Sequence, residues 1–279
     1  MKTPEQLKGA IRYIAKKNNL MPQEILQMFL FERILERLSV SKYKNNFILK
    51  GGLLISSIIG IAERTTMDMD TTVKDIPLKE NTICNIIKEI IAIDVGDGVE
   101  FKFVKIEPIR EDDVYNNFRV HIKGEYGKIN NSMKIDITTG DKITPSAIEY
   151  SYKMLFEDKK LPIMAYTLET ILAEKYETII RRNIGTTRAR DFYDLYVLFQ
   201  SRKNEVRKEF LKSAVNHTAT KSTSIKELKK YKEICNELRN EEALQKLWDN
   251  YIKENIYAAY LSYQDVVDNV LEVGQFISE

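Results

Sequence analysis

The chain has few of the residues on which zinc sites, disulfide frameworks and histidine catalysis depend. It holds two cysteines, Cys84 and Cys235, and two histidines, His121 and His217. No CxxC pair and no Cys/His spacing typical of zinc is present, and neither histidine has a neighbouring nucleophile. Isolated cysteines are more typical of a reducing cytosol than of a secreted domain, so we expect a cytoplasmic protein.

Long apolar runs and a strong net charge are also missing. The longest apolar stretch, residues 53–62, is interrupted by Ser56 and Ser57 and is too short to span a bilayer. The first residues, MKTPEQLKGAIRY, lack the apolar core of a signal peptide. We therefore expect no membrane partner. Because the formal net charge is only +2, any site for a polyanion must come from local clustering of basic side chains.

The hydrophobic pattern divides the chain into a mixed half and a helical half. Apolar spacing predicts extended segments, of which 117–126 and 132–138 look like a hairpin around the connection Gly-Lys-Ile-Asn-Asn. The other extended segments are 47–49, 67–73 and 100–107, and the helices expected among them are 4–19, 23–38, 53–62 and 78–93. Beyond about residue 145 the strand signal fades, and helices are predicted at 166–183, 188–201, 204–215, 225–239, 241–256 and in the tail to 279. The pattern predicts an α+β protein, with a mixed lobe over 1–150 and a helical lobe over 151–279.

The first candidate site is Lys50-Gly51-Gly52, between a predicted strand and a predicted helix. Glycines let the backbone approach a ligand closely, and a helix start offers free N–H groups and the positive end of a dipole. A triphosphate would suit such a site. The alternative is a plain strand-to-helix turn, which is the commoner meaning of an isolated glycine pair.

The second candidate is the acidic pair in Arg64-Thr65-Thr66-Met67-Asp68-Met69-Asp70. In an extended chain, residues i and i+2 point to one face about 6–7 Å apart, so Asp68 and Asp70 could share a hard cation such as Mg²⁺. Met69 between them would face the core. Taken alone, the pair is better explained as a solvated turn, but it follows the glycine turn by one helix.

Two further candidates are an aspartate and a lysine. Asp136 lies opposite the apolar face formed by Met133, Ile135 and Ile137, so it could add a third carboxylate to a metal site or simply be exposed. Lys175 lies on the apolar stripe of a predicted helix, where lysine usually has a partner or a task. A triphosphate would serve as that partner; the alternative is a long stem that carries the charge past the core edge.

The last candidate is Arg188-Ala189-Arg190-Asp191-Phe192-Tyr193-Asp194. Asp191 and Asp194 are neighbours on one flank of a predicted helix, and the alternative to a functional role is a surface ion pair between Arg190 and Asp194. Basic residues in and around this motif could line a channel for RNA phosphates, although such runs are usually solvated; they are Arg181-Arg182, Arg188, Arg190, Arg202-Lys203 and the run KELKKYK from Lys226.

In this order the five pieces resemble the AbiEii family of nucleotidyltransferases, which includes toxins of type IV toxin–antitoxin systems and the related MenT toxins. The match runs from Lys50 to Asp194. The resemblance implies a nucleotidyltransferase-like mixed sheet and a helical lobe that contributes to the active-site cleft. Gly52 departs from the wider superfamily, which often has Ser there, and Thr66 matches a position that is Ser in some relatives.

The resemblance also implies roles for individual residues. Lys50, Gly51, Gly52 and Thr66 would bind the nucleotide, and Lys175 its triphosphate. Asp68 and Asp70 would be catalytic acids that hold Mg²⁺, with Asp136 as the third acid. Asp191 or Asp194 would be the further essential acid, and the motif does not choose between them.

The function implied is transfer of a nucleotide from a nucleoside triphosphate, GTP or a pyrimidine triphosphate, to an RNA acceptor such as tRNA. The outcome would be growth arrest in abortive infection, an antiviral defence, with an antitoxin from the same operon that need not bind the toxin. Two alternatives use the same residues: phosphotransfer to a protein hydroxyl, and nucleotide or RNA binding without catalysis.

Overall fold

The chain divides into two units, which are considered separately. The computed structural model describes residues 3–77, 79–109 and 117–278. One unit comprises the residues up to Asp141 together with Ala147–Ala165, and the other comprises Lys142–Ser146 and the residues from Tyr166 onward. Leu78 and Glu279, at the limits of two predicted helices, lie outside the described residues. Residue 150, the predicted division, falls within a strand of the first unit.

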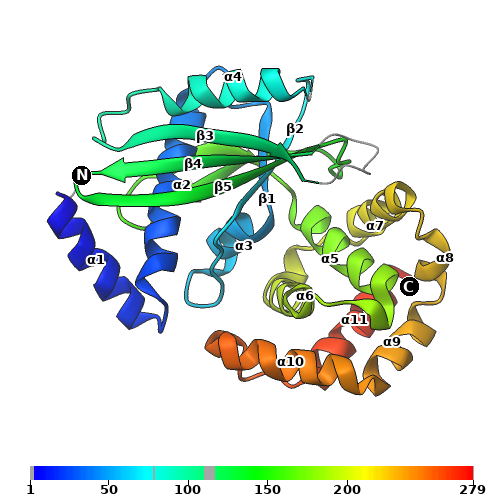
Figure 1. The fold of residues 1–279 in the computed structure, drawn as a ribbon. Helices are drawn as coiled ribbons and strands as arrows, with labels where there is room; N and C mark the ends of the chain where they lie inside the picture. Colours follow the sequence, from blue (N-terminus) through cyan, green and yellow to red (C-terminus); the bar gives the residue numbers. More distant parts are fainter. Residues whose placement is uncertain (1–2, 78, 110–116, 279) are drawn as a thin grey trace. The chain divides into compact units, whose positions relative to one another are not determined.

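The first unit is built on a mixed seven-stranded sheet (Figure 1). The strand order is β3-β4-β5-β2-β1-β7-β6, with parallel pairing of β2 to β5 and of β1 to β7 and antiparallel pairing elsewhere. Its elements are α1 (Pro4–Lys17), α2 (Pro22–Val40), β1 (Phe47–Lys50), α3 (Gly51–Ile59), β2 (Met69–Val73), α4 (Glu80–Ile91), β3 (Glu100–Pro108), β4 (Phe118–Tyr126), β5 (Ile129–Thr139), β6 (Ile148–Lys153) and β7 (Lys160–Ala165). The sheet confirms the predicted α+β class.

The predicted hairpin is confirmed, but its turn is tighter than expected. β4 and β5 pair from Tyr126 opposite Ile129 to Phe118 opposite Ile137. The connection is therefore only Gly127-Lys128, and Gly127 has a φ of 57°. Such a left-handed conformation is the one that two-residue hairpin turns favour. This register fixes which side chains of the two strands face each other.

Two strands occur between residues 145 and 165, where the sequence predicted neither strand nor helix. β6 and β7 lie beyond residue 145 and complete one side of the sheet, with β7 parallel to β1. The sequence of neither strand shows a clear strand pattern. β6 is largely exposed, and β7 contains Pro162, which lacks the backbone N–H that a strand residue donates. The prediction that strands end near residue 145 is wrong, because these strands depend on pairing with distant β1 rather than on their own pattern.

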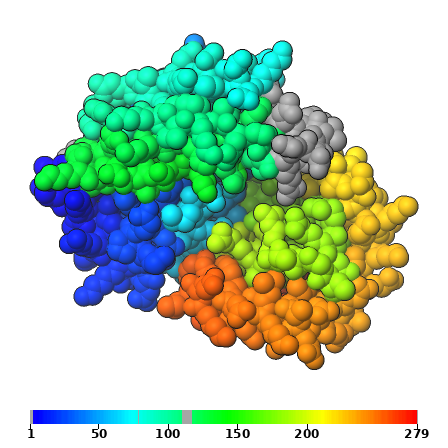
Figure 2. All heavy atoms as spheres, in the orientation of Figure 1, coloured from blue at the N-terminus to red at the C-terminus, as the bar shows by residue number. Residues whose placement is uncertain are grey.

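One face of the sheet is apolar and contacts α2. The buried residues of β4 and β5 alternate with partly exposed ones. A Cβ added at Gly124 would lie 3.1 Å from Leu30 of α2, so the helix packs directly on β4. The side chains of the strands β3 to β5 form an open surface in the space-filling view (Figure 2). The partly exposed side chains of β4 and β5, among them Arg119 and Asp136, alternate with the buried ones and project from the opposite face.

Helix α2 buries an unusual number of charged groups for a helix in the core. Arg37 forms two hydrogen bonds with Asp97, of 2.7 and 2.8 Å, and both side chains are buried. Glu32 is 1% exposed and accepts a 2.7 Å hydrogen bond from the backbone N–H of Leu155. Burial raises the pKa of Glu32 from 4.5 to about 8, against the lowering effects of the Leu155 N–H and of Arg33.

The raised pKa of Glu32 predicts a pH-dependent stability. Between pH 4.5 and about 8 the folded protein keeps a proton that the unfolded chain has lost, so the free energy of unfolding falls as pH rises through this interval. We expect Glu32→Gln to remove most of this slope and to be more stable than the wild type at pH 8.5, by roughly 3 kcal/mol. Urea denaturation at pH 5.5, 7 and 8.5 measures the difference, and equal slopes for both proteins would contradict it.

Beyond Tyr166, the described residues of the second unit form helices and the turns between them, in agreement with the predicted pattern. Its helices are α5 (Leu168–Arg182), α6 (Ala189–Arg202), α7 (Lys208–Ser222), α8 (Ile225–Lys229), α9 (Tyr231–Asn240), α10 (Glu242–Glu254) and α11 (Tyr263–Ser278). Its core contains Trp248, whose indole N–H donates to the carbonyl of Leu261 at 3.1 Å. Across the described residues, no helix combines the length and apolarity needed to cross a bilayer.

Candidate active site

Four charged residues form a row across the middle of the sheet. Arg119 on β4 is opposite Asp136 on β5, Asp136 is the partner of Asp70 on β2, and Asp70 is opposite Lys50 on β1. Residues paired in this way on adjacent strands project from the same face. The row therefore places two carboxylates side by side with a cationic side chain at each end.

The glycine turn lies against the second of these carboxylates. Gly51 follows β1 directly, begins α3 and has a φ of 65°. A Cβ at this position would lie 2.1 Å from Oδ2 of Asp70, so only glycine fits between the turn and the acid. Lys50, the N-cap residue, gives α3 no side-chain hydrogen bond, and the start of a helix favours an anion.

Steric crowding also explains why position 52 is a glycine. A Cβ there would lie 2.8 Å from Oγ1 of Thr66 and 3.0 Å from Nη2 of Arg64. The Thr66 hydroxyl donates to the carbonyl of Asp68 at 3.0 Å and accepts from its N–H at 3.3 Å. The Thr66 hydroxyl thus occupies the space that a side chain at position 52 would need.

The acidic pair lies at the start of β2. Met69 is 2% exposed and faces the core as predicted, whereas Asp68 and Asp70 are partly exposed. Asp68 lies near Arg119: hydrogen bonds to Asp136 raise the pKa of Arg119 above its usual value, and the charge of Asp68 adds to this effect. The two acids are thus on the open face, at the charged row.

Asp136 is engaged by an arginine that the sequence did not suggest. Its Oδ1 accepts from Nε of Arg119 and its Oδ2 from Nη2, both at 2.8 Å. Within the described parts of the chain, no three His, Cys, Asp or Glu side chains are grouped as metal ligands. At the other end of the row, Nζ of Lys50 lies 2.6 Å from Oδ2 of Asp141, another residue that the sequence did not suggest.

The remaining predicted residues form a separate cluster in the helical unit. Nζ of Lys175 on α5 lies 2.6 Å from Oδ1 of Asp191 and 2.9 Å from Oδ2 of Asp194, both on α6. Burial by itself would lower the pKa of Lys175, but the charges of Asp194 and Asp191 outweigh it and the pKa is raised. Asp194 therefore pairs with Lys175, and the partner of this lysine in the structure is a pair of carboxylates.

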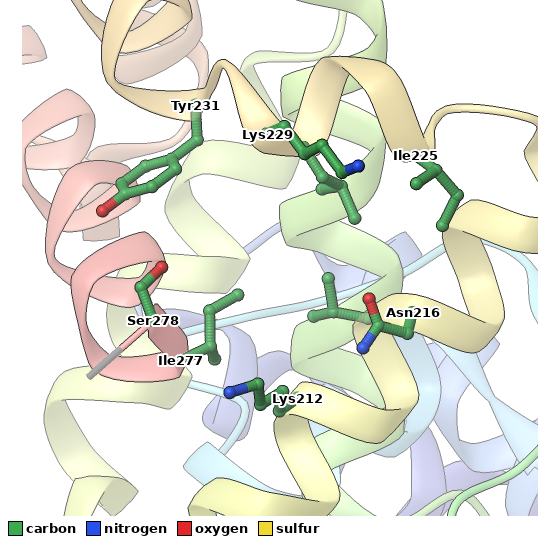
Figure 3. A pocket seen from close by; sticks show the side chains of 9 residues that line it. Lys212, Asn216, Ile225, Lys229, Tyr231, Ile277 and Ser278 are labelled. Carbon is green, nitrogen blue, oxygen red and sulfur yellow. The ribbon is translucent and has the colours of Figure 1, made fainter.

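The basic run from Lys226 borders a cavity in the same unit. The cavity has a volume of about 370 Å³ and lies among α7, α8, α9 and α11. Lys229 and Lys212 lie on different sides of it, and Tyr231 forms a third side (Figure 3). The rest of the lining consists of the apolar side chains of Val215, Ile225, Leu228 and Ile277 and the polar residues Asn216 and Ser278.

Comparison with known proteins places the chain among nucleotidyltransferases. The family model described as "Nucleotidyl transferase AbiEii toxin, Type IV TA system" matches residues 33–269. The crystal structure of JHP933 from Helicobacter pylori is similar, with a TM-score of 0.51 and 15% identity over 92% of this chain and 93% of that one. A second Helicobacter pylori structure, provisionally described as a nucleotidyltransferase, has a TM-score of 0.51 and 16% identity over 92% and 96% of the chains. No curated protein matches. At these identities the structures show a shared fold alone.

Proposed function

The chain belongs to the AbiEii family of nucleotidyltransferase toxins of type IV toxin–antitoxin systems, and from this premise we propose that it transfers a nucleotide from a nucleoside triphosphate to an RNA acceptor. The observation that carries the proposal is the contact between the glycine turn and Asp70. The backbone of Gly51 and the carboxylate of Asp70 are too close for any side chain between them, so a turn suited to phosphate and a carboxylate suited to a cation lie at one place.

The start of α3 would bind the phosphates. Gly51 and Gly52 expose the backbone at the first turn of α3, where N–H groups and the helix dipole favour an anion. Lys50 adds a positive charge beside the turn, and its ammonium group is held by Asp141 at 2.6 Å. Thr66, packed on Gly52, would keep the turn open to the nucleotide.

Asp68 and Asp70 would hold Mg²⁺. They fit this cation because they offer carboxylate oxygens from one or two acids, with room for phosphate oxygens as the remaining ligands. Bound there, Mg²⁺ would supply positive charge to the triphosphate during transfer. The protein residues would orient the triphosphate for in-line attack by the acceptor hydroxyl, with pyrophosphate as the leaving group.

In the helical unit, Lys175 would bind triphosphate oxygens and Asp191 would be the essential acid. Asp191 is favoured over Asp194 because one of its oxygens, Oδ2, is buried without a hydrogen bond. Asp194 is 0% exposed and lies against Lys175, a setting that suits a structural partner of the lysine. Nε of Arg188 lies 3.7 Å from this oxygen, and the oxygen could also accept a hydrogen bond from a further donor.

The cavity bordered by Lys212 and Lys229 would bind the acceptor RNA. Neither lysine has an ion-pair partner within the residues that the structure describes, and both are exposed. Cationic side chains bind the phosphates, and apolar or aromatic walls accept bases, in sites for single-stranded RNA. Tyr231 and Leu228 provide such walls at this cavity.

We expect Lys212→Gln/Lys229→Gln to weaken RNA binding by roughly 10-fold at low salt. The slope of log Kd against log salt should decrease by about 1.4, since each phosphate contact on a single strand contributes about 0.7. Fluorescence anisotropy with labelled RNA at several salt concentrations measures both quantities. The pair Lys8→Gln/Lys16→Gln, two exposed lysines of α1, is the matched control. An equal loss in both double variants would argue against a specific site.

One assay identifies both the triphosphate that the protein uses and the RNA that accepts the nucleotide. Purified protein is incubated with total RNA, Mg²⁺ and each α-labelled triphosphate in turn, and the RNA is separated on a gel. The proposal expects label in a discrete RNA band, of tRNA size, with GTP or a pyrimidine triphosphate. Absence of labelled RNA with all four triphosphates would contradict it.

The biological outcome would be growth arrest that an antitoxin relieves. A type IV antitoxin need not bind its toxin, so we propose a partner encoded in the same operon without a direct interface. Expression of the protein alone should arrest growth, and co-expression of the neighbouring gene should restore it. Growth arrest that persists when the neighbouring gene is co-expressed would contradict the proposal that this gene encodes the antitoxin.

A further inference from the structure

Both oxygens of the Asp136 carboxylate take part in a two-point ion pair with Arg119. Nε and Nη2 of Arg119 each donate to a different oxygen of Asp136 at 2.8 Å. Two N–H groups of a guanidinium can donate to the two oxygens of one carboxylate, and the hydrogen bonds in such a charged pair are shorter and stronger than those between neutral groups. The side chain of Asp136 is 15% exposed and that of Arg119 34%, so the pair is partly shielded from water.

The backbone fixes this ion pair in place. The hairpin register sets Arg119 directly opposite Asp136, and side chains opposite each other on antiparallel strands start only about 5 Å apart. The two-residue turn at Gly127-Lys128 holds the register, because a slip of one residue would turn the apolar face of β5 outward. The pair is therefore a fixed part of the sheet and does not depend on a flexible loop.

The ion pair between Arg119 and Asp136 changes how many cations the charged row can bind. Without Arg119, Asp136 beside Asp70 would make three acids with Asp68, a set suited to two metal ions. With Arg119 present, a positive charge already lies on the outer side of Asp136 and repels a second cation.

We infer that the Arg119 guanidinium takes the place of a second metal ion, so that the site binds a single divalent cation through Asp68 and Asp70. The inference rests on the proposed cation site of those two acids. Arg119 is a positioning residue in this arrangement: it neutralises Asp136 and keeps that carboxylate from bridging to the cation. Two-metal chemistry would then be absent from this chain although three acids lie near one another.

Counting Mn²⁺ bound to the purified, triphosphate-free protein tests the inference without an activity assay. The wild type should bind one Mn²⁺, and Asp136→Asn should also bind one, with an affinity within about 3-fold of the wild type. Arg119→Gln should bind two, and Arg119→Gln/Asp136→Asn one again. In Arg119→Gln the two ions would lie about 3.5–4 Å apart and give an exchange-coupled signal in electron paramagnetic resonance that the wild type lacks.

Arg119→Lys serves as the matched variant, since it retains the charge and the fold but not the two-point geometry; it should still bind one ion. Two Mn²⁺ ions in the wild type, one of them lost in Asp136→Asn, would overturn the inference and leave the proposed cation site intact. No Mn²⁺ binding by the wild type, or one ion that survives Asp68→Asn/Asp70→Asn, would overturn both. A single ion in Arg119→Gln would also overturn the inference.

Discussion

Asp70→Asn should abolish nucleotide transfer, with kcat lowered by at least about 10³-fold. The substitution keeps the size of the side chain that packs on Gly51 but removes the charge that would hold the cation. Asp68→Ala should behave alike, because a cation bound by two carboxylates loses half of its protein ligands. Label transfer to RNA and growth arrest in cells are the two measurements.

Gly51→Ala tests the contact between Gly51 and Asp70 by changing the glycine. The new Cβ would collide with Oδ2 of Asp70 at 2.1 Å, and the φ of 65° would strain any residue with a Cβ. Gly60→Ala is the matched control, since Gly60 has a φ of 97° but nothing within 4 Å of the added Cβ. Asp158→Asn, at an exposed position, controls for loss of a carboxylate. Growth arrest by Asp70→Asn equal to that by the wild type would contradict the proposed site.

The second large effect is expected at Lys175. Lys175→Met should destabilise the helical unit by about 3–5 kcal/mol, because it leaves Asp191 and Asp194 buried without their cation. These side chains are 6% and 0% exposed, so water cannot replace the lost charge. Denaturant unfolding, monitored by the fluorescence of Trp248 in this unit, measures the loss.

A triple variant separates the structural role of Lys175 from its proposed role in binding. Lys175→Met/Asp191→Asn/Asp194→Asn removes all three charges and should recover most of the lost stability, while transfer stays absent. The single variants distinguish the two acids: both should lose stability, because each breaks a buried ion pair with Lys175, but only Asp191→Asn should also lose transfer. If the triple variant transferred nucleotide, Lys175 and both acids would be structural only.

Much of the fold could be predicted from local patterns. The hairpin of β4 and β5, the helices after Tyr166 and the strand before the glycine turn all carry their own periodicity. β6 and β7 could not be predicted in this way, because β7 depends on a parallel pairing with β1 more than 100 residues earlier in the chain. Long-range pairing of this kind leaves little trace in a single segment.

Site residues that belong to short sequence motifs could be predicted. Contacts between side chains on different strands could not. The structure brings Gly51 and Asp70 together, as their order in the sequence suggested. Arg119 was missed because the hairpin connection was taken as five residues, and only the two-residue turn at Gly127 puts Arg119 opposite Asp136. For Lys175 the sequence indicated that a partner exists, but it did not reveal that two carboxylates provide it.

The central claim is that the chain moves a nucleotide, and not a phosphate, onto RNA. Its most direct test compares α-labelled with γ-labelled triphosphate in parallel reactions with Mg²⁺, total RNA and either wild-type protein or Asp70→Asn. We predict that α-label appears on RNA with the wild type only, and that γ-label is released as pyrophosphate. Label from the γ position on protein, or α-label on RNA with both proteins, would contradict the account.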